Sequence, residues 1–222
     1  IKTSRFICEK TTEPTIAKGI YLTAYTGATA SSLDALIALI DTTELNAVVI
    51  DIKDYTGKIL YPSTIPLVQE LNLSVPLLED IPGLIKKLHE KDIYVIARQT
   101  VFQDPALAQA KPSWAVHSQK GGIWYDHKGL AWVDPTKREL WEYNVDIAKE
   151  AISLGFDEIN FDYVRFPSDG NVSDMVFSAS PLVKEDQMRA FYTFLSQELS
   201  QEPAYISLDM FGYVMERHDG MS

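Results

Sequence analysis

The stretch Gly155-Phe-Asp-Glu-Ile-Asn-Phe-Asp-Tyr-Val-Arg-Phe-Pro167 predicts a helix end, then a short strand, then a charged strand terminus. Gly155 suits the C′ position of a helix, where a left-handed backbone is common. Residues of the strand alternate between two faces, so Asn160 and Asp162 share one face. Pro167 prevents the strand from continuing inside a sheet. Polar groups at the carboxyl end of a parallel strand face the ligand-binding side, which makes Asp162 the first candidate for chemistry.

Strands and helices alternate along the rest of the chain. The other predicted strands are Lys18–Ala24, Ala47–Lys53, Ile93–Arg98 and Ala204–Leu208. The predicted helices are Leu33–Asp41, Pro82–Lys91, a short one opened by Asp104-Pro105, one from Asp134-Pro135 to about Leu154, and Glu185–Gln201. This alternation predicts a mostly parallel sheet with right-handed crossovers.

Several short polar side chains stand at predicted helix starts. Ser31 or Ser32 can cap the first helix. Asp80, Asp104 and Asp134 each precede a helix, two of them directly before proline. For these three aspartates, capping is favoured over catalysis.

An α/β fold of the TIM type, a (β/α)8 barrel, accounts best for strands that end in Asp or Arg on one side. Such barrels need about 250 residues, and only five strands are recognisable in this chain. We therefore expect residues 18–222 to hold roughly two-thirds of a barrel whose C-terminal part is missing. A smaller open sheet is the alternative. Residues 1–17 have no clear period and are expected to be a lead-in linker.

Composition narrows the classes of partner. A formal charge of −11 argues against nucleic acid and anionic membrane surfaces, and is compatible with a neutral substrate such as a sugar. The single cysteine, Cys8, excludes an intrachain disulfide and a metal site built from several cysteines. The four histidines show no metal-ligand spacing, so neither zinc nor another cofactor is expected. Apolar runs such as Leu33–Ile40 are too short to span a bilayer, so no membrane insertion is expected.

Six charged residues stand at or just after predicted strand ends. They are Asp51, Asp54, Arg98, Asp162, Arg165 and Asp209. One interpretation is a structural ion-pair lattice, because buried charges need partners. Function is favoured for Asp162, whose strand end is central and densely polar, whereas both interpretations stay open for Asp209. Arg98 and Arg165 could hold carboxylates ionised or simply neutralise them.

Two carboxylates at neighbouring strand ends suit glycoside hydrolysis. One would act as nucleophile or electrostatic partner, and the other would donate a proton to the leaving oxygen. Aromatic residues in the predicted loops suggest a surface on which sugars stack. The segment His117–Trp132 is expected to form a hairpin-like excursion on the strand-end side. The candidate stacking residues are Trp124, Tyr125, Trp132 and Tyr163.

Five segments, in this order, resemble a bacterial glycoside hydrolase family of the α-amylase-like (β/α)8 barrel superfamily. They are Lys18-Gly-Ile-Tyr-Leu-Thr, Val48-Val-Ile-Asp-Ile-Lys-Asp54, Trp132-Val-Asp-Pro135, Phe156 to Pro167, and Ser207-Leu-Asp-Met-Phe-Gly212. The resemblance covers nearly the whole chain from Lys18 onward, and the Asp-Tyr-Val-Arg-Phe-Pro run is its most specific element. It implies a barrel and a carbohydrate substrate. We also expect an extracellular or cell-envelope location.

The resemblance also implies roles for two residues. Asp162 matches the nucleophile of α-amylase-like enzymes, and Asp209 matches their proton-donor position, where those enzymes carry Glu. They also carry Arg two residues before the nucleophile, where this chain has Asn160, and Arg165 follows instead. Asp51, Asp54, Arg98 and Arg165 are then expected to bind substrate.

Two rival functions remain open. The departures at Asn160 and Asp209 are compatible with a non-catalytic carbohydrate-binding or cell-envelope scaffold domain on a degenerate barrel. A metal-dependent hydrolase is the other, because Asp51, Asp162 and Asp209 could bind a hard divalent cation through oxygen ligands.

Overall fold

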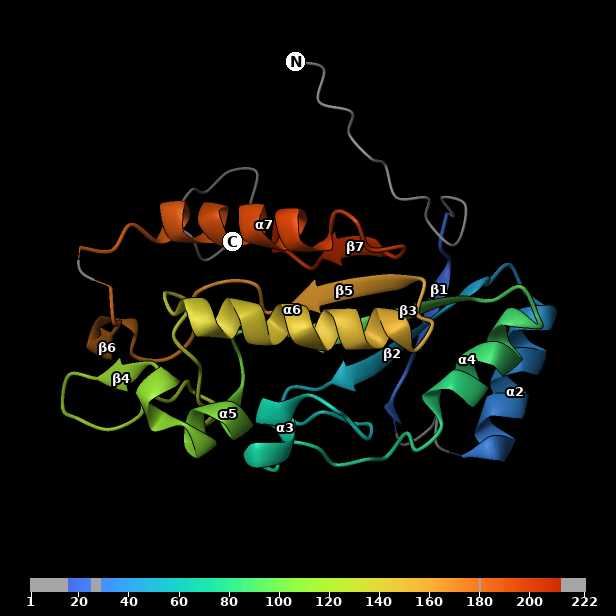
Figure 1. The fold of residues 1–222 in the computed structure, drawn as a ribbon, viewed down its shortest axis with the longest axis horizontal. Helices are drawn as coiled ribbons and strands as arrows, with labels where there is room; N and C mark the ends of the chain where they lie inside the picture. The colour runs from blue at the N-terminus through green and yellow to red at the C-terminus, as the bar shows by residue number, and fades with distance from the viewer. Residues whose placement is uncertain (1–15, 25–28, 180, 213–222) are drawn as a thin grey trace, which may run out of the picture.

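The computed structural model describes residues 16–24, 29–179 and 181–212, and the predicted linker therefore lies almost entirely outside the described residues. Five parallel strands form the main sheet in the order β1-β2-β3-β5-β7 (Figure 1). Their bounds are β1 Gly19–Leu22, β2 Ala47–Lys53, β3 Tyr94–Thr100, β5 Glu158–Asp162 and β7 Tyr205–Leu208. All five predicted strands are confirmed, and the fold is α/β with a parallel sheet. The described residues do not form a closed barrel, which stays a prediction.

Helices follow the strands in the predicted alternation, and Pro66–Glu70 adds a short helix that was not predicted. They are α2 Ala30–Asp41, α3 Pro66–Glu70, α4 Ile81–His89, α5 Pro105–Ala110, α6 Arg138–Ser153 and α7 Lys184–Leu199. Figure 1 shows that the arrowheads of β2 and β5 point toward the side where α5 lies with β4 (His117–Ser118) and β6 (Met175–Val176). The predicted excursion is thus partly a local hairpin, with Tyr125 bridging to Ala131, while its β4 edge pairs with β6. No helix in the described part of the chain is long and apolar enough to cross a membrane.

Two adjacent rows of side chains show which face of the sheet packs against the helices. Ile50, Ala97, Ile159 and Ile206 lie side by side across β2, β3, β5 and β7. The first three are fully buried in the main hydrophobic core that the helices cover. The next row, one residue further along, is Asp51, Arg98, Asn160 and Ser207. Because successive residues point to opposite faces, one face of the sheet packs into the main core. The other face has polar residues near the strand ends and a smaller apolar cluster of Ala47, Tyr94 and Ile96 nearer the strand starts.

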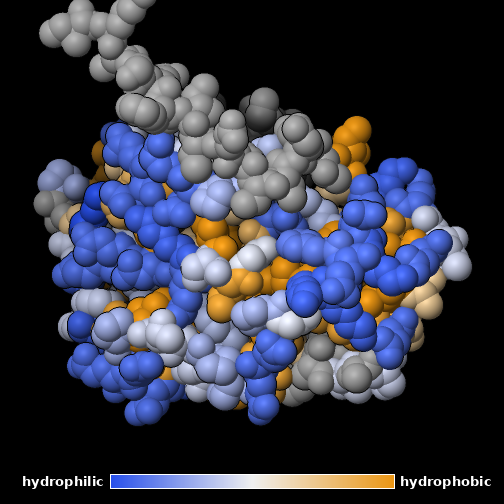
Figure 2. Space-filling view, turned by 45° about the vertical axis from the view of Figure 1, so that its right-hand side comes forward, coloured by the Kyte–Doolittle hydropathy of each residue, from blue (hydrophilic) through white to orange (hydrophobic). Residues whose placement is uncertain are grey.

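The stripe predicted for the last helix is confirmed. Met188, Phe191, Leu195 and Leu199 on α7 are all buried. Phe191 packs against Phe102 and Trp141 with ring centroids 4.9 and 5.5 Å apart. Elsewhere the surface is mainly hydrophilic: on the face drawn in Figure 2, apolar residues come to the surface in separate patches.

The predicted caps divide into two that are confirmed and two that are wrong. Asp80 and Asp104 accept hydrogen bonds from Gly83 N at 2.9 Å and Leu107 N at 2.8 Å, as an N-cap should. Ser31 and Ser32 lie inside α2, whose N-cap is Thr29. Asp134 does not cap α6, because the helix begins only at Arg138 and the Asp134 carboxylate binds Thr136 and the Ser178 N–H instead.

A buried ion pair ties the end of β2 to the start of α5. Lys53 Nζ lies 2.7 Å from Asp104 Oδ2, and both side chains are fully buried. Burial raises the pKa of Asp104, and the charge of Lys53 opposes that rise. Gly57 makes the approach possible: its φ is +82°, and a Cβ there would lie 1.9 Å from Asp104 Oδ1.

Glu150 on α6 holds the long loop that follows β2. Its carboxylate accepts hydrogen bonds from Tyr61 OH at 2.8 Å, Ser63 Oγ at 2.7 Å, and both the N–H and Oγ1 of Thr64 at 2.6 Å. Burial alone would raise the pKa of Glu150, but these donors outweigh burial and lower it. A folded-state pKa below the ordinary 4.5 means that the ionised form stabilises the fold.

We predict that Glu150→Gln lowers the free energy of unfolding by about 1–3 kcal/mol at pH 7, because the loop donors lose a charged acceptor. The wild-type advantage should be constant above pH 4.5 and shrink as the pH falls through the lowered pKa of Glu150. Urea unfolding from pH 7 to pH 3 measures it. Glu142→Gln, an exposed change on the same helix, is the control. Equal stability of the two variants at pH 7 would contradict the prediction.

Candidate active site

Arg98 joins the carboxyl ends of three strands. Its Nη1 donates to Asp51 Oδ1 at 2.8 Å, and its Nη2 pairs with Asp162 Oδ2. Burial alone would lower the pKa of Arg98, but the hydrogen bonds and charges of Asp51 and Asp162 outweigh burial and raise it. Arg98 therefore neutralises these two carboxylates, which is one of the two roles that the sequence left open for it.

Tyr21 on β1 extends this cluster and was not foreseen from the sequence. Its hydroxyl donates to Asp51 Oδ2, and its ring lies 5.9 Å from the Arg98 guanidinium carbon. Burial, followed by the hydrogen bond and negative charge of Asp51, raises the pKa of Tyr21. The strand register could have indicated this contact. Tyr21 pairs with Val49, and Val49 lies two residues before Asp51 on the same face of β2.

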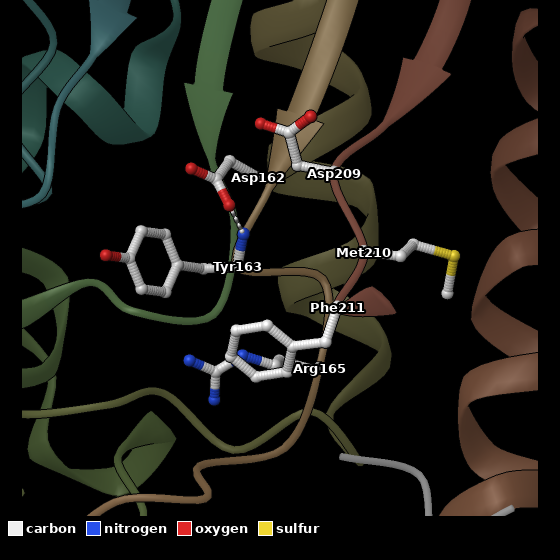
Figure 3. Close-up of a pocket in the computed structure, with 6 residues that line it drawn as sticks. All are labelled: Asp162, Tyr163, Arg165, Asp209, Met210 and Phe211. Carbon is white, nitrogen blue, oxygen red and sulfur yellow. Dashed lines mark hydrogen bonds between the residues drawn. The ribbon is translucent and has the colours of Figure 1, made fainter. Parts of the chain in front are cut away.

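The backbone turns sharply directly after Asp162. Tyr163 has a φ of +54°, which is uncommon for a residue with a large side chain. The Tyr163 N–H donates to Asp162 Oδ1 at 2.6 Å (Figure 3). Each oxygen of Asp162 thus has one donor, Arg98 on Oδ2 and Tyr163 on Oδ1.

Asp209 reaches the same place from the neighbouring strand. Its N–H donates to Phe161 O at 2.9 Å, which extends the β5–β7 pairing by one residue. Asn160 donates to Ser207 Oγ at 3.0 Å and to Asp209 Oδ1 at 3.3 Å. No lysine, arginine or histidine of the described residues forms an ion pair with Asp209.

A cavity of about 230 Å³ joins these groups. Figure 3 shows the two carboxylates close to each other on one side and Arg165 with Phe211 on the other. The lining residues are Asp162, Tyr163, Arg165, Asp209, Met210 and Phe211. Met210 and Phe211 were not predicted, and they follow Asp209 directly in the chain.

Three rings surround the Arg165 guanidinium. Its central carbon lies 4.5 Å from the Phe211 ring centroid, 5.2 Å from that of Trp132 and 5.6 Å from that of Tyr163. Nη1 donates to Phe166 O at 3.2 Å and Ser168 Oγ at 2.9 Å. Burial lowers the pKa of Arg165, and the negative charges around it offset only part of that effect.

The structure does not bring every predicted residue to the cavity. Asp54 accepts hydrogen bonds from Thr56 N at 2.9 Å and Thr56 Oγ1 at 2.5 Å, and so shapes the turn after β2. Trp124 and Trp132 are only 2% and 1% exposed, so their rings have no free face to offer a sugar. Their indole N–H groups bind Asn171 O and Asp126 Oδ2. Trp132 instead packs under Tyr163, and Tyr125 is 45% exposed but does not line the cavity.

The arrangement does not form a metal centre in the part of the chain that the structure describes. No three His, Cys, Asp or Glu side chains there are grouped to hold an ion. Asp51 and Asp162 both face Arg98, and a cation between them would compete with that guanidinium. The geometry gives the metal-dependent hydrolase no ligand set among these residues.

The fold is shared with several solved structures. A hypothetical protein from Ruminiclostridium thermocellum is 37% identical, with a TM-score of 0.81 over 88% of this chain and 99% of that one. A maltogenic α-amylase from Thermotoga neapolitana is 17% identical, with a TM-score of 0.56 over 90% of this chain and 47% of that one. An exo-β-N-acetylglucosaminidase from Vibrio harveyi is 12% identical, with a TM-score of 0.62 over 86% of this chain and 35% of that one.

The two enzymes show similarity of fold alone, and the chain spans less than half the length of either. Both are glycosidases, and this chain shares the fold of the part that it matches in each. No protein of curated function matches the chain in sequence. A family model described as "Putative glycosyl hydrolase domain" matches residues 19–222, and the chain belongs to that family.

We predict that Arg98→Gln lowers the free energy of unfolding by about 2–4 kcal/mol, because it leaves two partly buried carboxylates without their cation. Arg189→Gln is the matched control, since Arg189 also contacts two carboxylates but on the exposed surface of α7. That change should cost less than about 1 kcal/mol. Chemical denaturation of both variants measures the difference. Similar losses of unfolding free energy in the two variants would contradict the prediction.

Proposed function

We propose that this domain hydrolyses glycosidic bonds in an oligo- or polysaccharide, with Asp162 and Asp209 as its two carboxylates. The observation that carries the proposal is that both residues, from the ends of adjacent strands, line one cavity. Glycoside hydrolysis needs two carboxyl groups on either side of the bond to be broken. Membership of the family and the glycosidase folds support the same substrate class.

Asp162 suits the role of nucleophile or electrostatic partner. Arg98 and the Tyr163 N–H each donate to one of its oxygens and stabilise its negative charge. These donors also fix the carboxylate in one orientation at the cavity wall. A positioned anion stabilises the positive charge that develops on the sugar ring in the transition state.

Asp209 suits the role of proton donor. It is exposed, so it can exchange protons with water, and no described cation is paired with it. Among the described residues its carboxylate accepts one hydrogen bond, from Asn160 to Oδ1 at 3.3 Å, and Oδ2 accepts none. As the glycosidic C–O bond breaks, Asp209 would give its proton to that oxygen.

The position of Arg98 supports the α-amylase-like assignment. Asn160 occupies the position where those enzymes carry arginine, and the guanidinium on Asp162 comes from Arg98 on the neighbouring strand. Register places Arg98 directly beside Asn160. The site therefore has an arginine on its proposed nucleophile although the arginine of the family pattern is replaced.

A sugar-binding domain without turnover is the second candidate. Both Asp162 oxygens already have a donor, and a carboxylate held in this way is a weaker nucleophile than a free one. Such a domain would use the same cavity and the same polar groups to bind a sugar. Kinetics on substrates with different leaving groups separate the two candidates.

We predict that Asp162→Asn abolishes hydrolysis of both natural glycans and 4-nitrophenyl glycosides, because both need a negative charge at the sugar ring. Asp209→Asn should slow natural glycans by about 10²–10⁴-fold. It should slow nitrophenyl glycosides far less, because nitrophenolate leaves without a proton. Asp186→Asn on the exposed surface of α7 is the control. Glycan binding by the wild type without turnover of any substrate would favour the sugar-binding domain.

A further inference from the structure

Arg165 differs from Arg98 in having no close ion-pair partner among the described residues, although Asp162, Asp169 and Asp126 act on it from a greater distance. Among the described residues, no carboxylate forms an ion pair with Arg165, and its two hydrogen bonds go to a carbonyl and a hydroxyl. Both bonds come from Nη1, so Nε and Nη2 have no acceptor among these residues. These distant charges do not fully compensate burial, so a bound anion in direct contact would relieve the remaining cost of burying the cation.

The three rings around Arg165 do not replace a counter-ion. Phe211, Trp132 and Tyr163 attract the guanidinium through their π faces and restrict where it can move. They contribute no net negative charge, and they also displace water from the guanidinium. The result is a pre-positioned cation on the wall of a cavity that holds the proposed catalytic carboxylates.

We propose that Arg165 binds the carboxylate of an acidic sugar, so that the substrate class of this domain is a glycan containing uronic acid or a similar sugar acid. Hydrolysis of such a glycan rests on the proposed function, whereas binding of the sugar acid by Arg165 does not. A planar carboxylate matches the fork of N–H donors on a guanidinium, which can bind both oxygens at once. The cavity of about 230 Å³ suits one sugar unit.

The charge of the cavity disfavours a dianion more than a monoanion. Asp162 and Asp209 line the same space and repel any negative ligand. A dianionic phosphate would meet about twice the repulsion that a carboxylate meets. Arg165 lies on the opposite side of the cavity from the two carboxylates (Figure 3), so a sugar acid could direct its carboxylate to Arg165 and its ring toward them.

Binding of three probes to the wild-type protein tests the proposal without any turnover. D-glucuronate, D-glucose and glucose 6-phosphate share one ring and differ at C6. We expect D-glucuronate to bind about tenfold more tightly than D-glucose and more tightly than glucose 6-phosphate. The preference should weaken when the salt concentration rises from 50 to 500 mM, as a charge contact does. Calorimetry or ligand-observed NMR gives the affinities.

Arg165 variants then assign the preference to this residue. Arg165→Gln should abolish the tenfold preference, and Arg165→Lys should keep part of it, since lysine keeps the charge but loses the fork. Arg138→Gln is the matched control: Arg138 also lies over two rings, Trp141 and Phe194, but stands on the exposed side of α6. It should keep the preference in full. Thermal unfolding confirms that each variant is folded.

Several results would overturn the proposal. One is equal affinity of the wild type for D-glucuronate and D-glucose, including no measurable binding of either. Tighter binding of glucose 6-phosphate, or a preference that survives in Arg165→Gln, would also overturn it. Turnover of neutral glycans with no such preference would refute the acidic substrate and leave hydrolysis intact. Arg165-dependent binding of D-glucuronate without turnover of any glycan would support this inference and refute hydrolysis.

Discussion

The contacts of Arg98 with Asp51 and Asp162 fix the geometry on which the candidate site depends. These contacts require β2, β3 and β5 to stand in one register, because a shift by one residue would turn the three side chains to opposite faces. The same register puts Ile50, Ala97 and Ile159 together on the face that the helices cover. Hydrophobic burial and ion pairing therefore favour the same register of β2, β3 and β5. A shift in register would disrupt both.

Loops beyond the strand ends are held by charges that the helices supply. The Lys53–Asp104 pair fastens β2 to α5, and Glu150 on α6 gathers four donors from the loop after β2. Breaking a buried pair on one side costs several kcal/mol, so the loops are tied almost as firmly as the strands. The walls of the cavity come from other segments, the last residue of β5 and the residues that follow β5 and β7.

The sequence predicted what local rules control. Gly155 ends a helix, Asp104 caps one, and Asn160 and Asp162 share a face, each for a reason contained in a few neighbouring residues. It failed where distant residues decide: Asp134 faces Ser178 and not the helix after it, and Trp132 is buried although its segment looks like an aromatic loop. Tyr21 was missed for the same reason, since only pairing of β1 with β2 brings it to Asp51.

Arg98 and Arg165 show why residue type alone cannot assign roles in such a site. Both are partly buried arginines near the same strand ends, and the sequence gives them equal standing. Arg98 meets two carboxylates, which raise its pKa, whereas Arg165 meets three rings, and burial lowers its pKa. Arg98 is neutralised by close carboxylates within the fold, whereas we propose that Arg165 is neutralised by a negative group of the ligand. Charge balance around each guanidinium, which only the structure provides, thus separates a structural cation from one available to a ligand.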